Sequence, residues 1–154
     1  MGNRTNLVEY ALQIAEACAG RSEDPRKKVG AVAVSSTGRI LGTGYNGLAP
    51  GKQVPDSFWE DKETKNHYVL HAEQNLAAQI RLGEAEFVAC TLQPCPSCLK
   101  LLIAQGVKRI YFRQVHSSYN ESVQIALFYD VDLIWKPSKD EAETSKLKEF
   151  TVPN

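Results

Sequence analysis

The sequence predicts an α/β domain in which helices pack on a parallel or mixed β-sheet. The first observation is that helical and strand-like segments alternate between residues 71 and 135. The second is a pair of segments rich in apolar and β-branched residues, 29–36 and 38–46, which a Thr-Gly turn joins into a hairpin. The third is the length of 154 residues, which fits one domain with its own hydrophobic core.

Each element follows from a local pattern. The segment Thr5–Ala19 places apolar side chains at helical spacing, and Gly20 suits the end of a helix. Residues 47–68 combine Gly, Pro and charged residues, so a long loop is expected there. The later elements are expected as helices at 71–82, 96–105 and 121–129 and as strands at 87–92, 109–112 and 131–135. The domain should cover residues 1–137, and the polar tail 138–154 should form one short helix or be disordered.

Composition and charge argue against a nucleic acid polymer or a membrane as partner. The 18 basic residues balance the 18 acidic ones, whereas nucleic acid usually selects a basic surface. No stretch is long and apolar enough to cross a bilayer, and the N-terminus lacks the layout of a signal peptide. A cytoplasmic protein is expected, in which the four cysteines are ligands, reactive groups or core residues rather than disulfides.

Two short segments place metal-binding residues at the starts of two predicted helices. The first, HAE, contains His71 and Glu73, and the second, PCPSC, contains Cys95 and Cys98. A catalytic zinc takes three protein ligands and keeps a fourth position for water. Cys95 and Cys98 fall on one side of a first helical turn, where the helix dipole favours thiolates. We therefore expect one zinc held by His71, Cys95 and Cys98.

Glu73 is expected to serve as the acid and base of this site. It lies too close to His71 to be a second ligand, and a carboxylate beside the metal's water can move protons. Two alternatives for the cysteines are a redox pair and plain buried thiols. The combination of both segments, separated by one strand, is the signature of zinc nucleobase deaminases and argues against both alternatives.

With these two segments, RSEDPRKKVGA (21–31) and GTGYNG (42–47) complete a wider resemblance. The segments HAEQNLAAQ (71–79) and TLQPCPSCLKLLIAQGVKRIYF (91–112) identify the zinc-dependent cytidine deaminase superfamily. Within it, the chain resembles the deoxycytidylate (dCMP) deaminase family. The resemblance implies a three-layer α/β/α fold with a mixed five-stranded sheet. It also implies that Asn46 binds the sugar of the substrate and that the backbone at Ala72 contacts the pyrimidine.

The activity implied by the resemblance is hydrolytic deamination of dCMP to dUMP with release of ammonia, which supplies dUMP for thymidylate synthesis. A deaminase of another cytosine nucleotide, nucleoside or base would share the same chemistry. A tRNA adenosine deaminase would share the zinc segments but should have a basic surface. A structural zinc module, the alternative without catalysis, normally has four protein ligands rather than three.

A 5′-phosphate needs cationic donors, and the sequence offers two places for them. Arg26, Lys27 and Lys28 precede a strand that leads toward the expected site, although a solvated basic loop is the alternative. Arg113, directly after the strand at 109–112, is the second candidate. Tyr119 is a candidate for a contact with the substrate, against the alternative that it packs in the core.

The resemblance also implies assembly and regulation. A homo-oligomer is expected, either a hexamer or a dimer. Because several family members are activated by dCTP with magnesium, Mg²⁺ with an allosteric nucleotide is a further expectation. A second, structural zinc is not expected, since the loop after GYNG has no cysteine, and Cys18 and Cys90 should be packed thiols. His116 has no evident partner and is expected at the surface.

Overall fold

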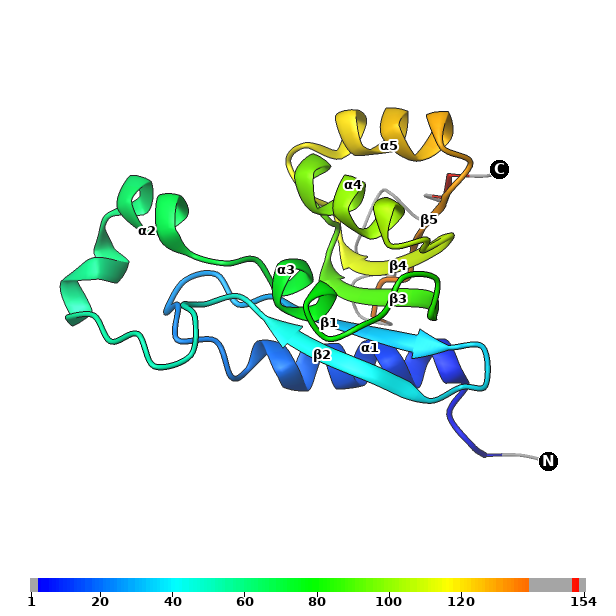
Figure 1. Ribbon diagram of the computed structural model, residues 1–154, viewed down its shortest axis with the longest axis horizontal. Coiled ribbons are helices and arrows are strands. Elements are labelled where there is room, and N and C mark those ends of the chain that lie inside the picture. The colour runs from blue at the N-terminus through cyan, green and yellow to red at the C-terminus, as the bar shows by residue number, and fades with distance from the viewer. Residues whose placement is uncertain (1–2, 139–150, 153–154) are drawn as a thin grey trace.

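A mixed β-sheet forms the centre of the computed structural model, which describes residues 3–138 and 151–152 (Figure 1). Its strands are β1 (Gly30–Ser35), β2 (Ile40–Tyr45), β3 (Ala85–Leu92), β4 (Arg109–Gln114), β5 (Asp132–Trp135) and β6 (Thr151–Val152). In the described part of the sheet their order is β2-β1-β3-β4-β5-β6. Strands β3, β4 and β5 run parallel, whereas β1 is antiparallel to both its neighbours and β6 is antiparallel to β5.

Helices cover both faces of this sheet, which gives the predicted three layers (Figure 1). The helices are α1 (Leu7–Ala19), α2 (Lys62–Tyr68), α3 (Ala72–Ala77), α4 (Pro96–Ala104) and α5 (Tyr119–Phe128), with a 3₁₀ helix, η1 (Asp56–Glu60). Helix α1 packs on one face and α3, α4 and α5 pack on the other. The predicted α/β class, with a mixed sheet between helices, is therefore confirmed.

Alternation along the strands separates two hydrophobic cores. In β1, Ala31 and Ala33 face the helices α3 to α5, while Val32 and Val34 face α1. Successive side chains of a strand point to opposite faces, so a strand covered on both sides becomes continuously apolar. Gly30 shows how closely α1 approaches, because a Cβ atom there would collide with the backbone of α1 at Ala15.

Two expectations about irregular segments need correction. Residues 47–68 are not a plain loop, since they contain η1 and α2. Asp61 caps α2 by accepting hydrogen bonds from the backbone N–H groups of Glu63 and Thr64, at 3.1 and 3.4 Å. Seven residues are too few for a clear helical period, so only this cap indicated the helix. The two ends of this segment, the excursion between β2 and α3, lie side by side where Gly47 and Leu70 form a bridge of two backbone hydrogen bonds.

The other correction concerns the end of the tail. Thr151 and Val152 form strand β6 on the edge of β5, so these two residues are neither helical nor disordered, and the expectation for 139–150 stays a prediction. The sheet consequently has a short sixth strand beyond the five that were expected. The rest of the tail beyond residue 138 lies outside the described residues, so the domain boundary at residue 137 stays a prediction.

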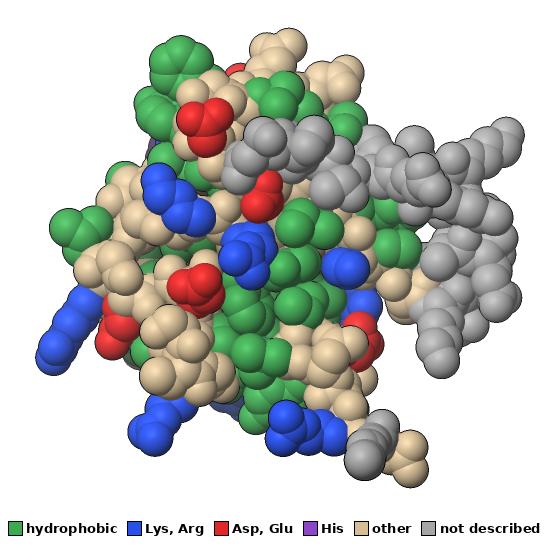
Figure 2. Space-filling view, turned by 90° about the vertical axis from the view of Figure 1, so that its right-hand side faces the viewer, with side chains coloured by type: hydrophobic (Ala, Val, Ile, Leu, Met, Phe, Trp, Pro, Cys, Tyr) green, Lys and Arg blue, Asp and Glu red, His purple; other side chains and the backbone are tan. Residues whose placement is uncertain are grey.

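The surface and the helices agree with the composition. On the face seen from the right of Figure 1, basic side chains are interspersed with acidic and hydrophobic ones over its described part (Figure 2). This mixing matches the equal numbers of basic and acidic residues. Among the described residues, no helix has the length and apolar character needed to cross a membrane.

Candidate active site

Two helix starts bring the predicted metal ligands together. His71 is the N-cap residue of α3, and Cys95 is the N-cap residue of α4, whose first turn contains Cys98. The side chain of Gln74 accepts a hydrogen bond of 2.7 Å from the backbone N–H of His71, which stabilises the start of α3. Pro96 occupies the first turn of α4, where its missing N–H costs nothing.

The distances between the three ligand atoms fit a tetrahedral zinc. Nδ1 of His71 lies 3.2 Å from Sγ of Cys98 and 3.6 Å from Sγ of Cys95. All three ligand atoms lie within 4.8 Å of one another. With Zn–N near 2.0 Å and Zn–S near 2.3 Å, a tetrahedron requires N···S separations of about 3.5 Å. One imidazole and two thiolates therefore stand where a single zinc ion would hold them.

The two sulfurs share one proton, which Cys95 gives up and Cys98 holds. The pKa of Cys95 is lowered to about 3, first by the hydrogen bond from the Cys98 thiol and then by the one from His71. The same hydrogen bond raises the pKa of Cys98, because the two sulfurs share one proton. The pKa of His71 is raised, chiefly by its hydrogen bond with Cys95. A divalent cation bound here would replace the shared protons and leave both sulfurs as thiolates.

Glu73 lies in the first turn of α3, beside these ligands and nearly out of contact with solvent. Its side chain is 4% exposed. Burial raises the pKa of Glu73 to about 7, and the negative charge of Cys95 acts in the same direction. A carboxyl group with a pKa near neutrality can both accept and release a proton. A bound cation would lower this pKa by direct attraction.

His71, Cys95 and Glu73 line a pocket that is open to solvent on one side. Of the residues predicted for the substrate, Asn46, Ala72 and Lys27 also line it. Asn46 is held in place because its Oδ1 accepts a 2.8 Å hydrogen bond from the N–H of Val29. Its Nδ2 donates a 2.7 Å hydrogen bond to the carbonyl of Lys27. One donor and one lone pair of the amide remain for a ligand.

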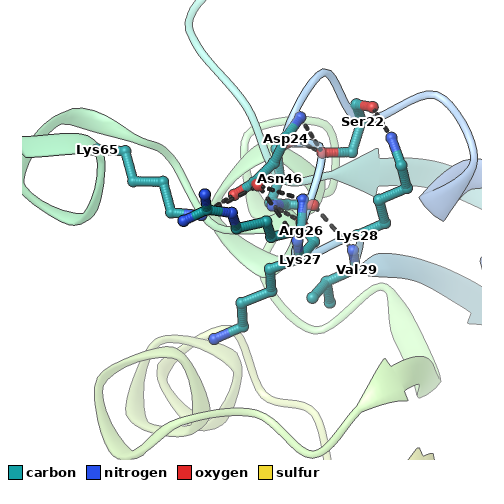
Figure 3. Close-up of polar contacts among 8 residues, drawn as sticks. All are labelled: Ser22, Asp24, Arg26, Lys27, Lys28, Val29, Asn46 and Lys65. Atoms are coloured by element: carbon teal, nitrogen blue, oxygen red, sulfur yellow. Dashed lines mark hydrogen bonds and ion pairs between the residues drawn. The ribbon is translucent and has the colours of Figure 1, made fainter. Parts of the chain in front are cut away.

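Three other candidates do not line the pocket. Nζ of Lys28 donates a 2.5 Å hydrogen bond to the carbonyl of Ser22 (Figure 3). Arg26 has an exposed side chain, and its backbone N–H donates to Asp24. Tyr119 begins α5 and is likewise not among the lining residues. These candidates therefore stay predictions without a place in the pocket wall.

The expectation for Arg113 needs correction, because its side chain points to the α1 face of the sheet. Its Nε donates to Glu16 and its Nη2 donates to Glu9, both at 2.7 Å. Nη1 also donates to the carbonyl of Lys136 at 3.1 Å. The alternation of β4 explains this direction, since the preceding Phe112 faces the opposite core. Arg113 thus anchors α1 to the sheet, away from the lining of the pocket.

Sequence reasoning missed several residues of the pocket wall. His116 lines the pocket, although it was expected at the surface. Its backbone N–H donates a 3.0 Å hydrogen bond to Oε1 of Gln93. Nε2 of Gln93 is buried without a partner in the described part of the chain. No local pattern marks either residue, because they meet only through the pairing of β3 with β4.

Asp24 and Asn66 also line the pocket and were not predicted. They come from the loop before β1 and from α2, the helix inside the expected loop. Asp24 is followed by Pro in the sequence, and this dipeptide indicates a turn. It does not indicate that the side chain of Asp24 lines a pocket.

The comparisons with known proteins agree with this geometry. The family described as cytidine and deoxycytidylate deaminase zinc-binding region matches residues 5–114. Deoxycytidylate deaminase of Pongo abelii is 34% identical over 134 residues, covering 80% of this chain and 74% of the relative. Deoxycytidylate deaminase of Homo sapiens is 36% identical over 123 residues, covering 74% of this chain and 67% of the relative.

Solved structures show the same likeness. The dCMP deaminase of cyanophage S-TIM5 in apo form matches with a TM-score of 0.70 and 27% identity, covering 87% of this chain and 100% of that one. The same phage enzyme in complex with dCMP and dUMP matches with a TM-score of 0.70 and 26% identity, covering 88% and 100%. The chain belongs to the cytidine and deoxycytidylate deaminase family, in the zinc-binding region that contains His71, Glu73, Cys95 and Cys98.

Proposed function

We propose that this protein is a zinc-dependent hydrolase that deaminates dCMP to dUMP and releases ammonia, supplying dUMP for thymidylate synthesis. The main support is the cluster of His71, Cys95 and Cys98, which meets the buried carboxyl group of Glu73 at a pocket lined by His71, Glu73 and Cys95. Three ligands leave a fourth position of the metal for water, as catalysis requires. The substrate follows from the relatives, which are named deoxycytidylate deaminases.

The chain's own residues divide the chemistry between them. When bound, zinc supplies Lewis-acid activation of a water molecule. Glu73 takes a proton from that water and delivers it to N3 of the cytosine ring. As the water oxygen bonds to C4 and the C4–N4 bond breaks, Glu73 transfers the second proton to the departing amine. The backbone at Ala72 and the side chain of Asn46 orient the base and the sugar from the pocket wall.

Lys27 is the best placed of the predicted phosphate donors, because it alone of those four cations lines the pocket. A hydrogen bond to a charged group contributes about 1.5–3 kcal/mol. If that energy is used in the transition state, Lys27→Met should lower kcat/KM for dCMP by about 10- to 150-fold. Deoxycytidine lacks the phosphate and should be turned over equally well by the wild type and the variant.

The matched control is Lys28→Met, since Lys28 is the adjacent lysine but is bonded to Ser22. It should leave the preference for dCMP over deoxycytidine close to that of the wild type. A panel of cytosine, cytidine, deoxycytidine, CMP, dCMP and dCTP, followed by ammonia release, tests the assignment as a whole. Faster turnover of deoxycytidine or cytosine than of dCMP would move the assignment to a nucleoside or base deaminase.

Location, assembly and regulation are further parts of the proposal. All four cysteines are free, which fits a reducing compartment such as the cytoplasm. A homo-oligomer, hexamer or dimer, is supported by the exposed apolar side chains at the end of α5, where Phe128 is 78% exposed. Light scattering tests this assembly. Mg²⁺ with an allosteric nucleotide has no assigned residues and is tested by adding dCTP and Mg²⁺ to the assay.

A further inference from the structure

A buried ion pair ties α2 to the loop that precedes β1. Nζ of Lys65 donates to both carboxylate oxygens of Asp24, at 2.8 and 3.0 Å (Figure 3). The side chains of Lys65 and Asp24 are only 7% and 3% exposed. Burial of two charges costs much of what their attraction contributes, so such a pair is weak evidence for stability alone. A role in placing the connected segments is therefore the question to ask.

The carboxylate of Asp24 also shapes its own loop. Oδ1 accepts hydrogen bonds from the backbone N–H groups of Arg26 at 2.9 Å and Lys27 at 3.1 Å. This arrangement is an Asx turn, in which a side chain takes the place of a backbone carbonyl. The ammonium group of Lys65 thus holds the same oxygen that sets the backbone position of Lys27 (Figure 3).

The network continues from this turn to Asn46. The N–H of Asp24 donates to Oγ of Ser22 at 3.2 Å, and that hydroxyl donates to the carbonyl of Asn46 at 2.8 Å. The Nδ2 group of Asn46 returns to the carbonyl of Lys27 at 2.7 Å. Lys65 is therefore connected, through Asp24, to the backbone of Lys27 and to Asn46, the two residues proposed to hold the phosphate and the sugar.

Charge gives the pair a second effect on the pocket. Asp24 lines the pocket, so an unpaired carboxylate there would repel an anionic ligand. Lys65 neutralises this charge from behind the wall without itself lining the pocket. An anionic substrate should therefore depend on Lys65 more than a neutral one does.

We propose that Asp24 and Lys65 are positioning residues that let the pocket accept a nucleotide. Asp24 fixes the turn that contains Lys27, and Lys65 neutralises the carboxylate charge of Asp24 in the pocket wall. This inference rests on the proposed dCMP deaminase function. It adds α2, which comes from the excursion between β2 and α3, to the elements that determine substrate preference.

The test measures kcat/KM for dCMP and deoxycytidine in Lys65→Met, in the wild-type and the Lys27→Met backgrounds. Loss of the ion pair between Lys65 and Asp24 should lower the preference for dCMP over deoxycytidine about ten- to hundredfold in the wild-type background, because small displacements of positioning groups have effects of this size. In the Lys27→Met background the further loss should be smaller, since the part that acts through the turn of Lys27 is already gone and only the repulsion by Asp24 remains. Equal losses for both substrates, or fully additive effects, would overturn the proposal.

Three further variants provide the controls. Lys62→Met removes an exposed lysine of the same helix and should leave the preference unchanged. Lys65→Arg keeps the positive charge and should retain most of the preference. The double variant Asp24→Asn with Lys65→Met leaves no unpaired charge, and its amide oxygen can still accept from the turn. It should recover part of the preference for dCMP, and it replaces Lys65→Met if that variant does not fold.

Hydrogen exchange separates a failure of this inference from a failure of the proposed function. The amide protons of Arg26 and Lys27 are bonded to Asp24, so Lys65→Met should increase their exchange rates. This readout needs no substrate and is valid even if dCMP is not turned over. Unchanged exchange rates at both amides would refute the positioning role. Increased exchange rates in Lys65→Met, combined with no dCMP turnover by the wild type, would support the positioning role and refute dCMP as the substrate.

Discussion

The proposed reaction centre and the polar wall of the pocket are held in place by different physical means. His71, Glu73, Cys95 and Cys98 belong to two helix starts that pack on one apolar core with Leu76 and Leu99 among its fully buried members. The polar wall residues Asp24, Lys27, Asn46 and His116 lie in segments without regular structure and are fixed by polar contacts. The reaction centre therefore inherits its geometry from dense packing, whereas the wall depends on a few directional bonds.

This difference teaches where substitutions should have separate effects. Changes at the helix starts should alter chemistry or metal content, and changes in the wall should alter substrate preference. A polar network loses much of its value when one member is removed, because the remaining buried groups are left unpaired. The following experiments would sharpen this separation or break it.

The largest effect is expected for Glu73→Gln. The amide is close to the carboxyl group in shape but cannot carry a proton, so kcat should fall by about 10²- to 10⁴-fold. Zinc content, measured by elemental analysis, should stay at one ion per chain, and thermal stability should be retained. Activity at the wild-type level would show that another residue is the acid and base.

Gly44→Ala should damage the reaction centre from the adjacent strand. A Cβ atom on Gly44 of β2 would collide with the carbonyl of Ala72 and lie 2.8 Å from the N–H of Leu76. Because this backbone belongs to α3, we expect unfolding to require about 1–3 kcal/mol less free energy and turnover to fall.

The matched control for that substitution is Gly47→Ala. A Cβ atom at Gly47 meets nothing within 4 Å, so the same added methyl group should change little. Urea unfolding and zinc content of both variants give the comparison. If the two alanines were equally disruptive, close contact between β2 and α3 would not be the cause.

Asn46→Ala should disturb the wall and leave the metal site intact. It removes the partners of the Val29 N–H and the Lys27 carbonyl, and each unsatisfied buried group costs about 1–3 kcal/mol. We expect a higher KM for dCMP and lower stability, with unchanged zinc content. Asn46→Asp keeps the acceptor for Val29 but loses the donor, so it should be the less destabilised of the two variants. Loss of zinc from Asn46→Ala would mean that wall and centre are not separate.

The smallest effect is expected in the acid range. Burial raises the pKa of Asp24. The hydrogen bonds from Lys65 and from the backbone of Arg26 and Lys27 lower this pKa by more, so the net pKa lies below its ordinary value. Because the pKa is lower in the folded state, this carboxylate stabilises the fold above its ordinary pKa. That contribution is lost as the pH falls through the folded value.

The stability advantage of the wild type over Asp24→Asn should therefore shrink as the pH is lowered below about 4. Urea unfolding of both proteins between pH 7 and pH 3 measures it, with Glu23→Gln, an exposed neighbour, as the matched control. An advantage that grew toward low pH would contradict the direction of the shift.

The fold class and the cluster of residues at the proposed reaction centre were predictable from the amino-acid sequence. The spacing of His71 to Glu73 and of Cys95 to Cys98 is local, and each pair lies at one helix start. The geometry of a first helical turn places residues three apart, such as Cys95 and Cys98, on one side, whatever the rest of the chain does. The joint signature of both segments then indicated zinc and the family, with which the comparisons agree.

Only the tertiary structure decided which polar residues face the pocket. Asp24 and Lys65 are 41 positions apart in the sequence, and Gln93 and His116 are 23 apart. Lys27 and Lys28 are adjacent residues of the same type, yet Lys27 lines the pocket and Lys28 donates a hydrogen bond to the carbonyl of Ser22. Periodicity reports the face of an element, but the direction of a loop side chain depends on sheet register and on partners far along the chain. For that physical reason the cluster of metal-binding residues was predictable, whereas Asp24, Gln93 and His116 of the wall were not.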